Sequence, residues 1–507
     1  MLPRLWQQAR GRAGNGLSNI IGKACAYSTT DRVTQPLPHS HPHIFRSQAE
    51  LTPGITAAEY ALRRDHLAEQ LPNGSAAIVV GHPTTFATQK IFNAFQQSTD
   101  FYYLTGLDEP DSIAVLERDT SLKNGYRFSL FVENRSQHEV RWSGPATGLD
   151  SAKSVFGADH AFPNTTFQDF YRQLCADVAA RRGSLYLDPP HQLMSSQMHP
   201  VHHAPTLATP PPPPPRAAGP AARTLSASAS WLRSTLSPPG TPSTRSLSPL
   251  IQAMRAIKSP AELGVMRRAG RISGESFAAV MGRPFDTEHA LAARLEYEFK
   301  SRGSKGSAYV PVVAGGRNAC VLHYVNNDMV MGEQDMVLVD AGGQFGGYAS
   351  DISRTFPVRG KFSPAQRELY AAVLAVQEEC IAISSTAVSL DEIHRRSISL
   401  MTCELNKLGF NATEANVSRD LYFHHVGHYL GLDVHDTPSV SRAQNLQPGN
   451  VITIEPGVYV PPNSRWPAKY HNIGIRIEDD VAISATGREV LTSSAPKTIE
   501  DIEHLWK

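Results

Sequence analysis

The sequence is poor in cysteine, lacks long apolar runs and carries almost no net charge. Its five cysteines are scattered without a C-x-x-C pair, which favours free thiols in a reducing compartment. No segment approaches the roughly 18 apolar residues of a membrane span, so we expect no membrane association. The formal net charge of +1 argues against a nucleic-acid partner, which would require a basic surface.

Two catalytic signatures are also missing from the sequence. There is no G-x-S-x-G turn of the kind that carries the nucleophile of many serine hydrolases, and no phosphate-binding G-x-x-x-x-G-K-[ST] loop. What is present is an ordinary globular composition, 41% hydrophobic and 19% charged over 507 residues. A chain of this length suits two or three domains.

The first thirty residues differ in composition from the rest of the chain. They hold four basic residues and no acid before Asp31, with an apolar side that includes Leu5 and Trp6. The unbroken apolar core of a secretory signal, roughly 7–15 residues, is missing. Residues 1–35 are therefore predicted to be a mitochondrial presequence that directs the protein to the matrix, with a cytosolic form where it is absent. A disordered basic tail is the alternative.

The pattern that follows predicts a smaller α/β domain over residues 45–203, after a polar tail at Pro36–His43. Strands alternate with helices along this region, the arrangement typical of α/β domains. The helices are expected over 57–71 and 165–182 and the strands over 75–81, 111–118, 126–134 and 184–188.

Residues 204–249 have a different composition, almost entirely Ala, Pro, Ser, Thr, Gly, Leu and Arg, with six consecutive prolines at 210–215. Such a segment cannot build a core and predicts a disordered or polyproline linker. A docking site for a proline-reading domain is the alternative.

Residues 250–507 are predicted to form an α+β domain. Its first long helix is expected to start after the N-cap Ser259, with Pro260 in the first turn and Glu262 completing a capping box. That helix should end near Gly282. Further helices are expected over 287–301, 363–383 and 391–409, with strands before and after the last pair.

Two aspartates stand at unusual positions in this domain. Asp340 ends the run MVLVD and Asp351 lies within YASDISRTFPV, where half-buried strands would normally carry apolar residues. A glycine-rich turn separates the two runs, so a hairpin can bring the carboxylates side by side. Two facing carboxylates in a poorly solvated site repel each other and take up a proton unless a cation binds. Two solvated strand ends are the alternative interpretation.

Four histidines occur within the segment HHVGHYLGLDVHD, residues 424–436, interleaved with glycines. A lone histidine is more often structural, but four in this setting are poorly explained in that way. Glycines beside a ligand histidine let the backbone approach a metal or substrate closely.

Two glutamates complete the set of candidate ligands. Glu455 ends the apolar run VITIE, where an unpaired carboxylate would be costly. Arg476 and Glu478 lie two residues apart in IGIRIEDD and so share one face of a strand. Four carboxylates and one histidine favour hard or borderline divalent ions, with Mn²⁺ the best fit and Zn²⁺ or Co²⁺ possible. The charge count supports two ions, which activate a water to hydroxide when they lie about 3.5–4 Å apart.

The order and context of these residues resemble the pita-bread metallopeptidases, which include aminopeptidase P, prolidase and methionine aminopeptidase. Asp100–Leu116 resembles the creatinase-like N-terminal domain of aminopeptidase P, and Thr52–Arg64 and Ala308–Gly316 resemble its mitochondrial, intermediate-cleaving members. Val310 departs from the pattern, since a proline is expected there.

The resemblance implies a role for each residue. Asp340 would bind one metal, Asp351 and Glu478 would bridge both, and His428 and Glu455 would complete the other. Glu455 would also act as general base. His435 would hydrogen-bond the scissile carbonyl, His323 and His424 would line the pocket for the penultimate proline, and Arg476 would steady Glu478. The expected pocket tyrosines are Tyr309 and Tyr459.

The implied function is hydrolysis of the bond between an N-terminal residue and a following proline, in peptides or imported mitochondrial proteins. A prolidase, which takes only dipeptides, shares all five ligands and is the nearest alternative. A non-catalytic pita-bread binding module is a second alternative, although such a module would be expected to have lost ligands. A homodimer is expected from the family.

Overall fold

The computed structural model describes residues 35–89, 91–188, 242–463 and 465–506. The predicted presequence, apart from Gln35, and most of the predicted linker lie outside these ranges. The chain divides into two compact units, Met1–Ile251 and Gln252–Lys507. None of the described helices is long and apolar enough to cross a membrane. The four cysteines in the described ranges are free.

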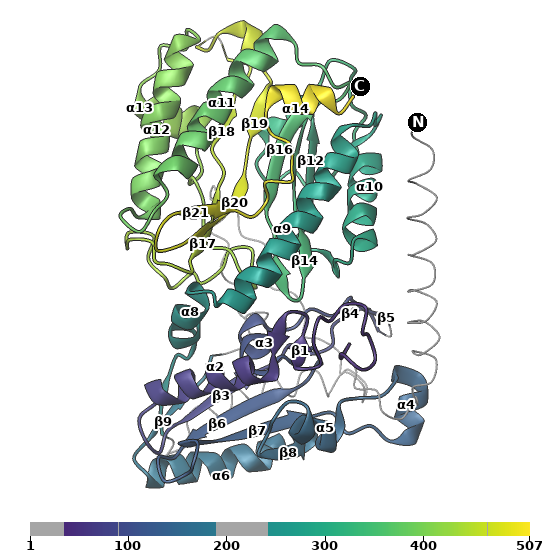
Figure 1. The fold of residues 1–507 in the computed structure, drawn as a ribbon, viewed down its shortest axis with the longest axis vertical. Coiled ribbons are helices and arrows are strands. Elements are labelled where there is room, and N and C mark those ends of the chain that lie inside the picture. Colours follow the sequence, from purple (N-terminus) through teal and green to yellow (C-terminus); the bar gives the residue numbers. More distant parts are fainter. Residues whose placement is uncertain (1–34, 90, 189–241, 464, 507) are drawn as a thin grey trace, which may run out of the picture. The chain divides into compact units, whose positions relative to one another are not determined.

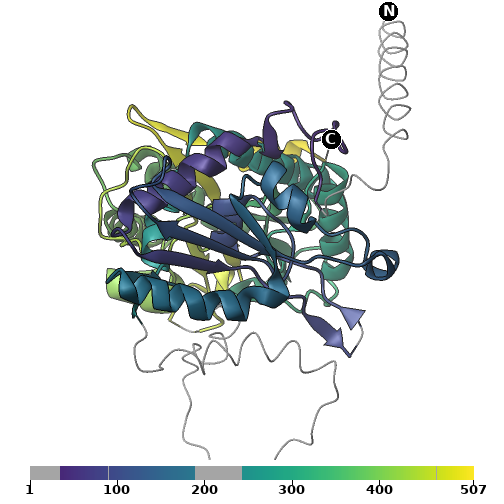
Figure 2. The same cartoon turned by 90° about the horizontal axis from the view of Figure 1, so that it is seen from below.

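The N-terminal unit is built on a mixed six-stranded sheet with the order β10-β9-β3-β6-β7-β8 among the described strands. Strands and helices are interspersed along this unit as predicted, although β6 and β7 follow each other directly and form an antiparallel pair. Helices α2 and α6 lie on opposite faces of this sheet (Figure 2). The strands are β3 (Ala76–Val80), β6 (Ile113–Arg118), β7 (Tyr126–Val132), β8 (His160–Pro163), β9 (Ser184–Tyr186) and β10 (Ser243–Arg245). The helices are α2 (Ala57–Gln70), α3 (Thr99–Thr105), α4 (Gln137–Ser143), α5 (Gly148–Ser154) and α6 (Phe167–Ala180).

Two segments of this unit differ from the sequence-based expectation. The side chain of Gln35 donates to the carbonyl of Gly106 and accepts from the backbone N–H of Asp108, and Leu37 is buried. Residues 35–37 therefore pack on the domain and are not a tail. Ser243–Arg245, placed in the linker by composition, forms β10 and pairs in parallel with β9. Composition could not predict the packing of either segment, because the residues that stabilise each one lie about 60 to 70 positions away in the sequence.

The first half of the C-terminal unit is a three-stranded sheet, β12-β13-β16, associated with two helices (Figure 1). Helix α9 (Pro260–Met281) begins with the predicted capping box at Ser259, and α10 (Glu288–Ser301) begins after the N-cap Thr287. A smaller sheet has the order β11-β14-β15. The strands are β11 (Gly306–Ser307), β12 (Val312–Gly315), β13 (Met336–Ala341), β14 (Gly343–Phe345), β15 (Tyr348–Ala349) and β16 (Ile352–Pro357).

The second half repeats the combination of short strands and a helix pair. Helices α11 (Pro364–Ile383) and α12 (Leu390–Lys407) pack on each other, and both begin with capping boxes. Strands β17 (Val451–Ile454), β20 (Asp479–Ile483) and β21 (Arg488–Val490) form one sheet, and β18 (Gly457–Tyr459) pairs with β19 (Gly474–Arg476). The final helix is α14 (Ile499–His504). One continuous hydrophobic core joins both halves. Asp340 lies on β13, and Asp351, Glu455 and Glu478 each directly adjoin a strand that contributes to this core.

Candidate metal centre

The two aspartates meet, but by a longer route than the predicted hairpin turn. Asp340 on β13 lies opposite Ser353 on β16, and Asp351 directly precedes β16. The residues between them form β14 and β15, which pair with each other and with β11. A Cβ added at Gly342 would lie 1.6 Å from the Ser350 carbonyl oxygen, so this crossing requires glycine. The Tyr309 hydroxyl lies 2.6 Å from Asp340 Oδ1 and within hydrogen-bond distance of Asp351 Oδ1, and its single proton can be donated to either carboxylate.

The histidine segment runs beside β17 like a further strand. The backbone N–H of Thr453 donates to the His428 carbonyl at 2.9 Å, and that of Glu455 donates to the Val426 carbonyl at 2.8 Å. A Cβ added at Gly427 would lie 1.9 Å from the Thr453 carbonyl oxygen. This glycine is therefore required for close approach to β17, not to a metal or substrate as the sequence suggested. The pairing brings the side chains of His428 and Glu455 together.

Four of the five predicted ligands lie close together: His428 and the carboxylates of Asp351, Glu455 and Glu478. The Nδ1 of His428 lies 3.1 Å from the Tyr429 carbonyl, which accepts the ring N–H and leaves Nε2 to face the carboxylates. From Nε2 the distances are 3.5 Å to Asp351 Oδ2 and 3.6 Å to Glu455 Oε1. Ligand atoms of Asp351, His428 and Glu478 lie within 4.8 Å of one another. Asp340 joins this group through the hydroxyl of Tyr309.

Arg476 has a different direct partner from the predicted one. Its Nη2 donates to Asp340 Oδ2 at 2.6 Å, and its Nε donates to Ser353 Oγ at 2.9 Å. Ser353 in turn donates to Glu478 Oε2 at 2.7 Å. Arg476 therefore reaches Glu478 through Ser353, a residue that the sequence analysis did not single out.

Tyr459 and His424 extend this chain of hydrogen bonds and determine the tautomer of the histidine. Arg476 Nη1 can only donate, so Tyr459 Oη accepts from it at 2.7 Å. The Tyr459 proton is then directed to His424 Nε2, 2.9 Å away. His424 must therefore carry its proton on Nδ1, which lies 2.9 Å from the His425 carbonyl and 3.8 Å from Glu455 Oε2. Burial, assisted by Arg476, lowers the pKa of His424 to about 3 and keeps the ring neutral.

Two further predicted histidines lie on the open side of the centre. The exposed ring of His435 packs edge-on against His428, with ring centroids 4.5 Å apart. His323 is exposed on an irregular segment after the short helix 316–320. Burial, followed by His428 and more weakly His323, lowers the pKa of His435. Their contacts with substrate remain a prediction.

Three of the four carboxylates of this centre are poorly compensated by the cations around them, whereas His428 and Tyr309 lower the pKa of the fourth, Asp351, against the effect of burial. Burial raises the pKa of Glu455 to about 7 despite His428, and it raises the pKa of Asp340 despite Arg476. Burial and the neighbouring carboxylates, Asp351 first, hold the pKa of Glu478 well above its usual range. For His428 burial favours the neutral ring, but Asp351 and Glu455 outweigh it and raise the pKa to about 9.

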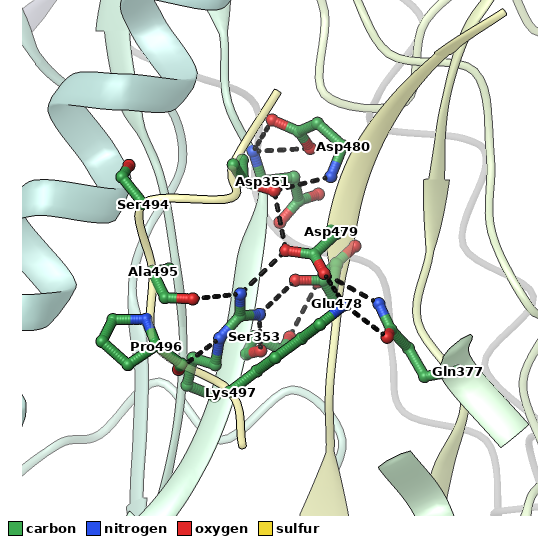
Figure 3. Close-up of polar contacts among 12 residues, drawn as sticks. Asp351, Ser353, Gln377, Glu478, Asp479, Asp480, Ser494, Ala495, Pro496 and Lys497 are labelled. Carbon is green, nitrogen blue, oxygen red and sulfur yellow. Dashed lines mark hydrogen bonds and ion pairs between the residues drawn. The ribbon is translucent and has the colours of Figure 1, made fainter. Parts of the chain in front are cut away.

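A second buried charge cluster lies directly beside the first (Figure 3). Asp479 accepts from Arg354 at 2.8 Å and from Lys497 at 2.9 Å. The Arg354 guanidinium also donates to the carbonyls of Glu478, Ala495 and Pro496, and the Asp480 carboxylate accepts from the backbone N–H of Asp351. These residues hold the strands that carry Asp351 and Glu478. The run Ser353-Arg354-Thr355 inside an otherwise apolar strand was the sequence signal for this cluster.

The donor set of the first cluster fits a pair of divalent cations. Four carboxylates converge with one histidine, and the cationic side chain bonded to them is Arg476. The raised pKa values show that the protein leaves negative charge uncompensated there, which a bound cation would correct. Oxygen ligands with one imidazole are the donors of hard or borderline ions.

Comparison with known proteins gives two family matches in the chain. Residues 264–485 match the model of metallopeptidase family M24, and residues 60–182 match the aminopeptidase P N-terminal domain. The two matches fall on the two units of the structure and agree with the predicted pita-bread domain and its α/β partner.

Curated relatives match along nearly the whole chain. Intermediate cleaving peptidase 55 of Saccharomyces cerevisiae is 41% identical over 479 residues, covering 93% of this chain and 88% of that protein. Xaa-Pro aminopeptidase 3 of Mus musculus is 37% identical, covering 93% and 90%. Intermediate cleaving peptidase 55, mitochondrial, of Arabidopsis thaliana is 37% identical, covering 95% and 89%.

Among solved structures, that of Icp55 from Saccharomyces cerevisiae bound to the inhibitor apstatin is similar with a TM-score of 0.72 and 38% identity. It covers 90% of this chain and 99% of the matched chain.

Proposed function

We infer the function from the premise that the chain belongs to metallopeptidase family M24 and carries an aminopeptidase P N-terminal domain. The protein is an Xaa-Pro aminopeptidase of the mitochondrial, intermediate-cleaving type, and it uses divalent metal ions. Its substrates are peptides whose second residue is proline. The observation that carries the site assignment is the buried cluster of carboxylates around His428, which has too few cations to balance it.

We propose that Asp340, Asp351, His428, Glu455 and Glu478 hold two ions. The resemblance implies that Asp351 and Glu478 would be shared by both ions, Asp340 would hold one of them, and His428 and Glu455 the other; ligand atoms of Asp351, His428 and Glu478 lie within 4.8 Å of one another. When bound, the ions supply Lewis acidity and activate water at neutral pH. Mn²⁺ is the proposed metal because four of the five donors are carboxylates.

The protein's own groups move the protons of the reaction. Glu455 accepts a proton from the attacking water as its oxygen adds to the scissile carbonyl. His435 donates a hydrogen bond to the developing oxyanion. As the C–N bond breaks, Glu455 returns the proton to the proline nitrogen. His424, neutral and fixed by Tyr459, lines the proline pocket with His323 and Tyr309.

This arrangement suits an Xaa-Pro bond for a chemical reason. That bond is a tertiary amide without an N–H, so an enzyme that holds its substrate through the N–H cannot use it. Attack on a polarised carbonyl has no such requirement. The substrate's free α-amine can dock beside the Asp340 carboxylate, which restricts the enzyme to N-termini.

The finer assignments are also proposals. We place the enzyme in the mitochondrial matrix, with a cytosolic form where residues 1–35 are absent, and expect a homodimer. We propose an N-terminal domain over the predicted residues 45–203, extended by residues 35–37 and strand β10, and a catalytic domain over 250–507.

The test uses protein lacking residues 1–34, stripped of metal and reloaded with Mn²⁺, Zn²⁺ or Co²⁺. It is offered a tripeptide Xaa-Pro-Xaa, the dipeptide Xaa-Pro and a tripeptide without proline. We expect cleavage of the first peptide only, fastest with Mn²⁺. Cleavage of the dipeptide alone would make the protein a prolidase. Metal binding without any cleavage would indicate a binding module.

A further inference from the structure

His435 has little to hold its own side chain in place. Its ring is exposed, and its packing partner is the edge of His428. Within the described ranges, no hydrogen bond joins this ring to another residue. A histidine that must meet a developing oxyanion within hydrogen-bond distance needs a fixed backbone if its side chain is otherwise free. The next residue along the chain, Asp436, supplies such an attachment.

The Asp436 side chain is 1% exposed and lies between two buried cations. Oδ1 accepts from Arg255 Nη2, and Oδ2 accepts from Lys258 Nζ at 3.0 Å. The Asp436 backbone N–H donates to the Tyr429 carbonyl at 2.9 Å, which ties the segment back to the residue after His428. A Cβ added at Gly431 would lie 2.5 Å from Asp436 Oδ2, so glycine is needed for the carboxylate to fit.

The surrounding backbone is attached to the same short stretch of chain. Gln252 accepts from the backbone N–H of Ser439 at 2.9 Å, and Asn450 donates to the Ala256 carbonyl at 2.8 Å. Thr437, which follows Asp436, has φ +48°, a left-handed conformation unusual for a β-branched residue. Such strain persists only where neighbouring contacts impose it. The contacts of Asp436 therefore determine the backbone conformation directly C-terminal to His435.

We propose that Asp436 is a positioning residue: its buried ion pairs with Arg255 and Lys258 hold His435 over the metal centre in the orientation needed to bind the oxyanion. This proposal rests on the function proposed above for His435. A buried ion pair adds little to stability compared with apolar packing, so its value here is the fixed geometry of the next residue.

The experiment is a double-mutant cycle between His435→Ala and Asp436→Asn, measured as kcat and KM on the Xaa-Pro-Xaa tripeptide. We expect His435→Ala to lower kcat by roughly 10²–10³, the scale of losing one oxyanion donor. Asp436→Asn should lower kcat by about 10- to 100-fold with a smaller change in KM. If Asp436 acts through His435, the double variant should be no slower than His435→Ala alone.

The matched control is Asp433→Asn, because Asp433 pairs with the same Arg255 at 2.7 Å but is 43% exposed. Its kcat should stay close to that of the wild type. Metal content and thermal unfolding are recorded for every variant. If Asp436→Asn does not fold, the same cycle is run with Lys258→Gln, which removes one of the two cations.

Three results would overturn the proposal. Multiplying losses in the double variant, or a wild-type kcat for Asp436→Asn, would show that Asp436 is structural only, while the role of His435 stands. A wild-type kcat for His435→Ala would remove the oxyanion role itself, and the positioning proposal with it.

Discussion

Glu478 and Asp479 are neighbours in the chain and are both almost fully buried, yet they belong to opposite kinds of charge cluster. Glu478 lies among three other carboxylates, and its pKa is held well above the usual range. Asp479 is bonded to Arg354, Lys497, Gln377 and Thr492. Although burial opposes ionisation, Arg354 and Lys497 lower its pKa. The protein thus compensates one carboxylate completely and leaves the next one unbalanced.

This difference in charge balance distinguishes the candidate metal ligand Glu478 from Asp479, which helps to hold the site in place. A buried carboxylate with its own cations has no need of a ligand, whereas one without them either takes up a proton or binds a metal ion. Asp436 belongs to the compensated kind, since Arg255 and Lys258 lower its pKa against the effect of burial. Charge balance therefore separates Asp340, Glu455 and Glu478 from Asp479 and Asp436. Two acids do not follow this division: His428 and Tyr309 lower the pKa of the candidate ligand Asp351 against the effect of burial, and burial and Asp351 hold the pKa of Asp480 well above its usual range.

The largest effect is expected from Glu478→Gln. Losing a carboxylate that is proposed to bind both ions should reduce kcat/KM by more than the roughly 10–100-fold that is typical when a residue hydrogen-bonded to a metal ligand is replaced. The metal-free variant should be at least as stable as metal-free wild type, because removing an uncompensated acid relieves repulsion. Peptidase assays, metal analysis and denaturant unfolding test this. Full activity with two ions bound would contradict the ligand assignment.

Asp479→Asn should have the opposite profile. It leaves Arg354 and Lys497 buried without their carboxylate, which typically costs 3–5 kcal/mol. We expect this loss in the free energy of unfolding when the metal-free variant is unfolded with denaturant, whereas Glu478→Gln should cause no such loss. Equal stability of the two variants would contradict the conclusion that Asp479 is compensated by its cations and Glu478 is not.

The pH dependence of the metal-free protein should reveal the unbalanced cluster next. Folding raises the pKa of Glu455 from 4.5 to about 7 and that of His428 from 6.5 to about 9, so the folded state holds protons that the unfolded state releases. This contribution to stability is complete below the unfolded pKa values and is lost as pH rises through the folded ones.

The midpoint of urea unfolding should therefore fall between about pH 7 and pH 9 in metal-free protein, above the range in which His424 and His394, whose pKa values burial lowers to about 3 and about 4, add stability as pH rises. Added Mn²⁺ should remove the fall, because the ions take over the role of the bound protons. A midpoint that rises over this range without metal would contradict the arrangement.

The smallest effect on activity is expected from deleting the predicted presequence. Loss of residues 1–34 should leave kcat/KM and stability unchanged in vitro, because a presequence serves import and is removed from the mature protein. The same deletion should prevent import into isolated mitochondria. Import of the truncated protein would contradict the presequence prediction, and lost activity would show that the segment contributes to the fold.

Much of the molecule could be predicted from local sequence. Helices such as α9 and α11 start where Ser259 and Ser363 with their capping boxes indicate, because a cap is satisfied within four residues. The order of Asp340, Asp351, His428, Glu455 and Glu478 also identified the family. Segments such as Ser243–Arg245 were missed, since a strand at a sheet edge depends on a partner distant in the chain.

The sequence by itself predicted the candidate ligands, two domains and the approximate bounds of the long helices such as α9 and α11, because each was inferred from residue types within short segments. Short helices such as α4 and α5 were not predicted. The tertiary structure alone decided which acids are compensated. The contacts of Ser353 with Arg476 and Glu478, of Arg354 with Asp479 and of Asp436 with Lys258 span more than 120 residues each. Such pairings form only when strands and helices pack against each other. A buried charge without a partner is energetically costly, and only the folded chain brings oppositely charged residues close to it.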